Sequence, residues 1–181
     1  PRKVYDITRR LPPEILTVGV FRNEHPDLVV KHAHEAGVKA VQLHGRETPA
    51  QTQQIAKHFR WVIKVFDVGS EQLTRAVDYG TQMIMIDTPK EHGGGKVFDW
   101  ELASDAPSNL DLILAGGLHP DNVAAAIEAV EPWGVDVASG VEASPGRKDP
   151  TLVRRFINNA RAAAPRPYLG DDEFPYDWAD E

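Results

Sequence analysis

The sequence predicts an α/β fold with a parallel sheet, and three features of its 181 residues support that prediction. Short apolar runs recur along the chain, segments with helical patterning separate them, and polar or glycine-rich turns follow four of them. The runs are continuously apolar rather than alternating, as expected for parallel strands that are covered on both faces. Alternating strands and helices of this length imply right-handed crossovers, which fit either a doubly wound open sheet or a closed (β/α)8 barrel. The pattern alone does not separate these two architectures.

The apolar runs predict six strands, each rich in β-branched or aliphatic residues. In chain order they are 15–21, 40–43, 61–66, 83–86, 112–115 and 135–138. A helix-like segment, 2–5, opens the chain before the first strand. Because the sequence starts at Pro1 rather than Met, we expect that a further segment precedes it in the full protein.

Helix boundary signals lie between the apolar runs. Thr48 can cap a helix, Pro49 suits the first helical position, and Gln51 can complete a capping box. Gly37 and Gly80 follow helical patterns, and each can adopt the left-handed conformation that ends a helix. These signals predict one helix that starts at Pro49 and two helices that each end shortly before a strand.

The charge of the chain is unevenly distributed. The formal net charge is -7, and the segment 165–181 contributes -5 of it, with six acidic residues against one Arg. We therefore divide the chain into a domain over 1–164 and an acidic, aromatic tail over 165–181. The nearly neutral domain lacks the basic stripe that would neutralise the phosphates of a nucleic acid, so we expect no nucleic-acid partner. A small anion can still be bound locally.

The absence of Cys excludes disulfides and thiolate metal sites and suits a reducing compartment. No apolar run approaches the ~20 residues of a membrane span, and no signal-peptide pattern opens the chain. We therefore predict a soluble, cytoplasmic protein without a membrane partner. His32 and His34 share a helical segment but not a helix face, so we expect no metal site.

Four strand ends are followed by polar or glycine-rich turns, at 42–45, 87–89, 115–118 and 136–141. All four turns would lie at the carboxyl edge of a parallel sheet, which is where α/β barrels hold their active sites. Gly116, Gly117 and Gly140 would let a phosphate approach backbone N–H groups closely. A glycine pair after a strand is also an ordinary tight turn, and that alternative stays open.

Asp87 ends a strongly apolar strand. Partial desolvation there would raise its pKa, so that the carboxyl group could donate a proton near neutrality. An Asp that merely opens an Asp-Thr-Pro turn is an equally weighted interpretation. The glycines within 92–96 are typical of a mobile lid, whereas their spacing matches neither a Walker A loop nor a dinucleotide fingerprint.

Five segments in order along the chain resemble phosphoribosylanthranilate isomerase, and the resemblance runs from Pro1 to about Ala160. They are 18–21 (VGVF), 41–45 (VQLHG), 93–100 (GGGKVFDW), 115–123 (AGGLHPDNV) and 135–149 (VDVASGVEASPGRKD). Each segment is weakly specific, but their order and spacing together are specific. The resemblance implies a (β/α)8 TIM barrel that here lacks its first strand, first helix and second strand.

The resemblance implies an enzyme of tryptophan biosynthesis whose small-molecule substrate is N-(5-phosphoribosyl)anthranilate. The family catalyses the Amadori rearrangement of that substrate to 1-(2-carboxyphenylamino)-1-deoxyribulose 5-phosphate, without a metal or an organic cofactor. Acidic and basic side chains must then carry the chemistry. The oligomeric state is left open.

By this resemblance, Asp87 matches the general acid that protonates the ring oxygen of the sugar. The general base of the family is a Cys on the first strand, and this sequence contains no Cys. We therefore expect the base to precede Pro1 and the chain to be inactive by itself. Arg2 matches the residue that pairs with the anthranilate carboxylate, with a solvated terminal Arg as the alternative.

Further site residues follow from the same resemblance. Asp136 matches a substrate-contacting carboxylate, and His44 is a weaker candidate for the pocket. The glycines at 93–95 lack the hydroxyl residue that the family usually has in this loop, which puts its substrate contact in doubt. The residues that match the phosphate site are Gly116, Gly117, Ser139 and Gly140.

Two other functional interpretations stay open. A non-catalytic relative that binds phosphate or a partner, and that truly lacks the first strands, would carry the same segments. Another phosphate-binding barrel, such as indole-glycerol-phosphate synthase or a pentose-phosphate epimerase, is disfavoured by the segment 95–100 (GKVFDW).

Overall fold

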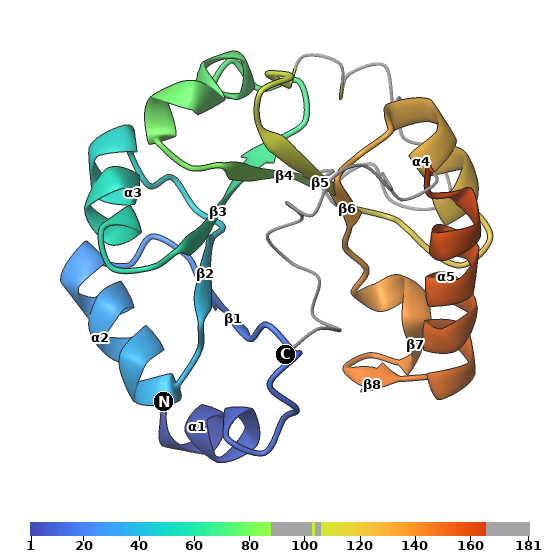
Figure 1. Cartoon of the computed structure of the whole chain (residues 1–181), viewed down its shortest axis with the longest axis horizontal. Helices are drawn as coiled ribbons and strands as arrows, with labels where there is room; N and C mark the ends of the chain where they lie inside the picture. The colour runs from blue at the N-terminus through green and yellow to red at the C-terminus, as the bar shows by residue number, and fades with distance from the viewer. Residues whose placement is uncertain (88–102, 104–105, 166–181) are drawn as a thin grey trace, which may run out of the picture.

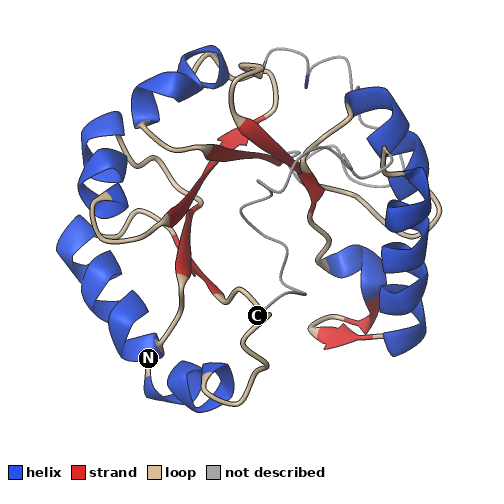
Figure 2. Cartoon of the chain, viewed as in Figure 1, coloured by secondary structure: helices blue, strands red, loops and turns tan. Residues whose placement is uncertain are grey.

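A computed structural model of the chain describes residues 1–87, 103 and 106–165. Its centre is a six-stranded parallel sheet with the strand order β1-β2-β3-β4-β5-β6, so that strands adjacent in sequence are neighbours in the sheet. The sheet curves, and the helices cover its outer, convex side (Figure 1). Figure 2 shows the same arrangement as an inner arc of strands inside an outer row of helices. This is part of a (β/α) barrel, because a doubly wound sheet would carry helices on both faces.

The elements of the sheet and its covering layer have the following bounds. The parallel strands are β1 (Val18–Phe21), β2 (Ala40–Leu43), β3 (Trp61–Asp67), β4 (Met83–Asp87), β5 (Asp111–Leu114) and β6 (Gly134–Val135). The helices are α1 (Arg2–Thr8), α2 (Pro26–Ala36), α3 (Pro49–Ala56), α4 (Val123–Val130) and α5 (Pro150–Ala163), with 3-10 segments η1 (Leu73–Tyr79) and η4 (Ser139–Val141). A short antiparallel hairpin, β7 (Glu142–Ser144) and β8 (Arg147–Lys148), lies before α5.

The six predicted strands are all present, and the first and last are shorter than predicted. The first begins later because the residues before it form a turn, in which the N–H of Ile15 donates to Pro12 O at 3.0 Å. The last covers only Gly134–Val135. After it, the N–H of Asp136 still donates to Leu114 O at 2.8 Å, and the chain then turns into η4.

The helix boundaries follow the sequence signals. The Thr48 hydroxyl accepts a hydrogen bond from the N–H of Gln51, and the Gln51 side chain accepts one from the N–H of Thr48. This is the predicted capping box, and Pro49 is the first residue of α3. Gly37 and Gly80 end their helices with φ values of 65° and 68°, in the left-handed region. The prediction is therefore confirmed at each of these residues.

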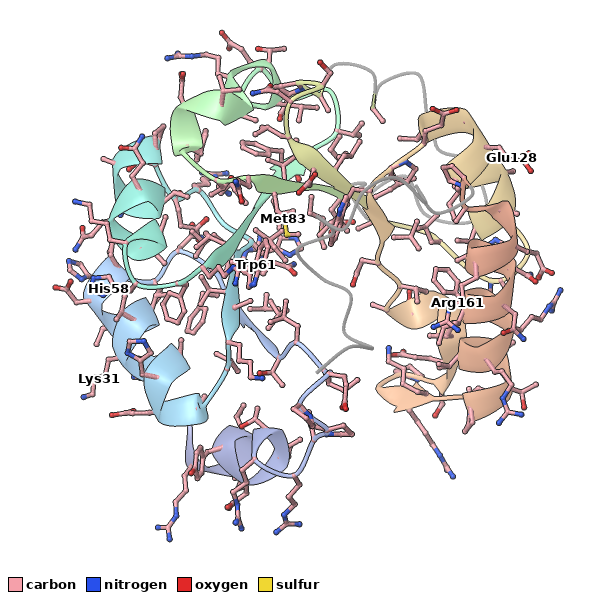
Figure 3. The ribbon with its side chains drawn as sticks, viewed as in Figure 1. Lys31, His58, Trp61, Met83, Glu128 and Arg161 are labelled. Atoms are coloured by element: carbon pink, nitrogen blue, oxygen red, sulfur yellow. The ribbon has the colours of Figure 1, made fainter. Side chains whose placement is uncertain are left out.

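Side chains pack on both faces of the sheet. Figure 3 shows Trp61 and Met83 in the middle of the curve, whereas Lys31 on α2 and His58 in the turn after α3 lie in the outer layer. The inner cluster consists of Ala40, Trp61, Ile63, Val65, Met83, Met85, Ile113 and Ala115. Three further clusters fill the space between the sheet and the helices. Each large apolar side chain buried there stabilises the fold by about 1.5–3 kcal/mol. A shift of one residue in strand pairing would expose these side chains, so their burial fixes the register of the strands.

Among the helices of the described residues, none is long and apolar enough to cross a membrane. The predicted lid at 92–96 and the tail from 166 onward lie outside the described residues. The division into a domain over 1–164 and a tail over 165–181 therefore stays a prediction.

Candidate active site

Three polar side chains share one face and one edge of the sheet. Successive side chains along a strand point to opposite faces, so alternate residues share a face. Gln42 and His44 continue the inward set that Ala40 begins on β2, and Asp87 continues the inward set of Met85 on β4. All three lie at or just beyond the carboxyl ends of their strands. This is the inner side of the edge where the sequence predicts the site.

His44 and Asp87 are in direct contact. Nε2 of His44 lies 3.3 Å from Oδ2 of Asp87, and the two side chains keep 38% and 29% exposure. On the other side of the imidazole, the amide nitrogen of Gln42 lies 3.3 Å from Nδ1 of His44. An amide N–H that donates to Nδ1 leaves the ring proton on Nε2, next to the Asp87 carboxylate. The three side chains thus form a row that ends on the proposed acid.

Asp136 is the second carboxylate of this cluster. The hydrogen bond from its N–H to Leu114 O keeps it beside the end of β5. Its side chain is reached by solvent, yet the surrounding protein partly desolvates the carboxyl group and raises its pKa. The negative charge of Asp87 raises this pKa further, whereas Lys148 and His44 lower it. These interactions couple the protonation of Asp136 to that of its neighbours in the site.

Lys148 supports the chain just after Asp136. Its ammonium group donates to Ala138 O at 2.6 Å and to Oε1 of Glu142 at 2.9 Å. The hydrogen bonds from Lys148 and from the N–H of Gly146 lower the pKa of Glu142. No role for Lys148 was predictable from the sequence, because nothing in the motif indicates that its side chain reaches back over ten residues to a carbonyl.

The predicted phosphate-binding residues lie on two turns in contact. Gly116 and Gly117 follow β5 with φ values of 87° and 65°, which residues with a side chain rarely adopt. Gly140 packs against the same turn, since a Cβ atom there would lie 1.9 Å from Leu118 O. Ser139 is exposed and begins η4. Gly140 therefore has a packing requirement in addition to any role in binding phosphate.

Asp87 and the glycine turns lie at the same edge of the sheet. Ile86 pairs with Leu114 across β4 and β5, and the N–H of Ala115 donates to Ile86 O at 2.9 Å. Asp87 and Gly116 therefore leave neighbouring strands side by side. A carboxyl group at the opposite edge of the sheet could not share a site with the glycine turns. The register of β4 and β5 instead places Asp87 beside the turn that contains Gly116.

Arg2 is not brought into this cluster. It is exposed and is the first residue of α1, which is anchored to α2 by the hydrogen bond from the Thr8 hydroxyl to Ala36 O at 2.9 Å. Figure 1 draws the N-terminus among the outer helices rather than inside the curve of the sheet. The pairing of Arg2 with a substrate carboxylate stays a prediction.

Two further expectations concern parts of the site. The glycine loop after Asp87, at 93–95, lies outside the described residues. Within the part of the chain that the structure describes, no group of three His, Asp or Glu side chains is arranged to hold a metal ion.

A curved parallel sheet, helices on its outer side, and a carboxyl–imidazole pair beside glycine turns at the carboxyl edge define an enzyme of the (β/α)-barrel class. Comparison with known proteins gives the family. The chain belongs to the family of N-(5'-phosphoribosyl)anthranilate isomerases, whose sequence model matches residues 1–159. The resemblance inferred from the five sequence segments is confirmed.

Individual relatives agree with this assignment. An N-(5'-phosphoribosyl)anthranilate isomerase from Desulforudis audaxviator is 49% identical over 164 residues, which are 87% of this chain and 78% of the relative. The crystal structure of phosphoribosyl anthranilate isomerase from Thermotoga maritima matches with a TM-score of 0.77 and 41% identity, over 88% of this chain and 79% of that one. A structure of the isomerase in complex with reduced 1-(o-carboxyphenylamino)-1-deoxyribulose 5-phosphate matches with a TM-score of 0.74 and 39% identity, over 88% and 78%.

Proposed function

We propose that this chain carries the acid and the phosphate-binding part of a phosphoribosylanthranilate isomerase active site. The reaction of the family converts N-(5-phosphoribosyl)anthranilate to 1-(2-carboxyphenylamino)-1-deoxyribulose 5-phosphate in tryptophan biosynthesis. The observation that supports this most directly is the contact of His44 with Asp87, beside the turn that holds Gly116 and Gly117. A proton donor next to a phosphate-binding turn is what a phosphorylated sugar substrate requires.

The first chemical step opens the ribose ring. The proton of the Asp87 carboxyl group goes to the furanose ring oxygen, and the C1–O bond breaks with its electron pair moving to that oxygen. The nitrogen lone pair of the anthranilate forms a C1=N bond, which gives an iminium ion. Among the described residues, His44 contacts Oδ2 of Asp87, and we place Oδ1 of the same carboxyl group toward the sugar.

The second step removes a proton from C2 of the iminium ion, which gives an enolamine with a C1=C2 double bond. C1 then gains a proton and the C2 hydroxyl loses one, which gives the keto sugar of the product. The base that the resemblance implies is a Cys, and these 181 residues contain none. The described side chains therefore account for the acid, and the Cys base stays a prediction about the full gene product.

The remaining residues would hold the substrate in place. The phosphate is proposed to accept hydrogen bonds from the backbone N–H groups of the two turns that contain Gly116, Gly117, Ser139 and Gly140. Asp136 is proposed to contact the sugar, since it shares the cluster of His44 and Asp87. Arg2 is proposed for the anthranilate carboxylate, where a guanidinium group can form two parallel hydrogen bonds.

The test is turnover of N-(5-phosphoribosyl)anthranilate by the full gene product, followed as the loss of substrate fluorescence. We expect saturable turnover and competition by inorganic phosphate. A gene product that binds phosphate but leaves the fluorescence unchanged would favour the alternative of a non-catalytic phosphate-binding relative.

A further inference from the structure

Two buried charged residues, Lys64 of β3 and Glu47 after β2, have no part in the steps above. Their side chains are 3% and 2% exposed, and Nζ of Lys64 lies 3.2 Å from Oε2 of Glu47. The neighbours of Lys64 on its strand, Ile63 and Val65, belong to the inner cluster. Because side chains alternate along a strand, Lys64 points outward and lies behind the wall of the site. Any effect on a substrate inside must therefore pass through other residues.

Lys64 binds the backbone on both sides of His44. Its ammonium group donates to Leu43 O at 3.2 Å and to Gly45 O at 2.9 Å, the carbonyl groups just before and just after His44. It also donates to Val65 O at 2.8 Å. An ammonium group has three N–H donors, so these carbonyls and Glu47 share its whole capacity. The backbone that carries the imidazole is thus tied to a side chain of the next strand.

Glu47 ties the same turn to the end of β1. Its Oε1 accepts the N–H of Asn23 at 2.8 Å, and its Oε2 accepts the N–H of Gly45 at 3.0 Å. The Oδ1 of Asn23 accepts the N–H of Arg46 at 2.6 Å, which closes the link from the other side. A Cβ atom on Gly45 would lie 2.4 Å from Oδ1 of Asn23 and 2.6 Å from Oε1 of Glu47. The turn has no room to move toward either residue.

Burial and the mutual attraction of the two groups act on their pKa values in opposite directions. Burial by itself raises the pKa of Glu47, but the backbone hydrogen bond from Asn23 and the charge of Lys64 outweigh it, so that the pKa is lowered overall. Burial lowers the pKa of Lys64, and Glu47 opposes that shift. A buried ion pair adds little net stability, because desolvation offsets the attraction between the charges. Stability alone therefore gives a weak reason for charges at these two positions.

We propose that Lys64 and Glu47 are positioning residues for the isomerase reaction, because they fix the turn that sets the His44 imidazole against Asp87. The inference rests on the proposed function. Neither residue touches the reacting atoms, and neither contacts the glycine turns after β5 and β6. Loss of the pair should therefore slow proton transfer at Asp87 and leave substrate affinity nearly unchanged.

The test uses the full gene product and the double variant Lys64→Met with Glu47→Leu. Removing both charges together avoids a buried charge without a partner. Small displacements of catalytic groups reduce turnover steeply, so we expect kcat to fall at least about tenfold while KM stays within about threefold. The 15N resonances of the His44 ring should also shift. The control is Val29→Ala, which lowers stability by opening space at a fully buried position of α2 and should keep kcat and the His44 resonances.

The outcomes separate this inference from the proposed function. A parent protein without turnover contradicts the proposed function. An active parent with a folded double variant that keeps kcat within about twofold overturns the positioning role. If the double variant does not fold, Glu47→Gln is measured, because it keeps the size of the side chain and turns one acceptor into a donor facing the N–H of Gly45. If Glu47→Gln also fails to fold, or lowers the Tm while keeping kcat as Val29→Ala should, the pair serves folding and the proposal is wrong.

Discussion

His44 and Asp87 meet across the full width of β3. The imidazole follows β2, the carboxyl group ends β4, and the two side chains approach to 3.3 Å. In a flat sheet, strands two positions apart are separated by roughly 9.5 Å, which is too far for this contact between side chains that stand roughly perpendicular to the sheet. The curvature toward the inner face closes that distance (Figure 1). The candidate site therefore depends on the barrel geometry and not on any single strand.

Asp87→Asn should remove the general acid. An amide of the same size cannot protonate the ring oxygen, so we expect kcat of the full gene product to fall by about 100-fold to 10,000-fold, with the fold retained. Asp111→Asn is a matched control, because Asp111 begins the neighbouring strand β5 opposite Met83, at the other edge of the sheet. The control should keep kcat within about threefold. Turnover of Asp87→Asn within about tenfold of the parent would reject the assignment.

His44→Ala should lower kcat by a smaller factor, about tenfold to 100-fold, because the Asp87 carboxyl group remains but loses the partner that orients it. The two residues serve one proton transfer, so their effects should not add. We expect the double variant with Asp87→Asn to be no slower than Asp87→Asn alone. A double variant that shows the full product of the two losses would indicate independent roles. Steady-state kinetics of the three variants measure this.

Asp136→Asn should stabilise the protein at neutral pH while reducing activity. The folded-state pKa of Asp136 is raised by partial desolvation and by Asp87, so the folded protein holds this proton more tightly than the unfolded chain. The stability linked to the group is complete below its unfolded pKa and is lost as the pH rises through the folded pKa. The Tm advantage of the variant should therefore grow from about pH 4 to about pH 7. An advantage that is constant or shrinks over this range would contradict the raised pKa.

Gly140→Ala and Gly117→Ala should differ in how much they lower the Tm and the affinity for substrate. A Cβ atom at Gly140 would meet Leu118 O at 1.9 Å, so the two phosphate turns must separate, and both the Tm and the affinity for substrate should fall. A Cβ atom at Gly117 meets nothing within 4 Å, and the cost is the strain of its φ of 65°, about 1–2 kcal/mol. Thermal unfolding and KM for both variants check this. Equal losses would mean that the contact between the turns is unimportant.

Local features of the fold were predictable from the sequence, and contacts between distant segments were not. The capping box at Thr48 and the left-handed Gly37 depend on a few adjacent residues, so the sequence contains the whole signal. The contact of His44 with Asp87 depends on the curvature of three strands, which no local pattern specifies. The desolvation expected at Asp87 from its apolar strand is only partial, since 29% of the side chain is exposed. Burial does raise the pKa of Asp136, the second carboxyl group of the same cluster.

The sequence contains a signal that Lys64 is buried with a partner. A Lys inside the apolar run 61–66 must find partners when the strand is buried, and Glu47 is the acidic residue that meets it. The sequence could indicate that a partner exists, but it could not identify the partner. Arg2 illustrates the opposite case, since its identity suggested a binding role and its place on the outer layer does not bring it to the cluster.

Two neighbouring strands of the inner arc, β3 and β4, start in packed hydrocarbon and finish in a carboxyl group, as β4 does between Met83 and Asp87. A library of single substitutions along β3 and β4 should therefore divide by position. Changes at the strand starts would alter the yield of folded protein, and changes past the strand ends would alter the rate and the choice of substrate. A designer could then exchange the loops at one edge for new chemistry and keep the strand starts unchanged.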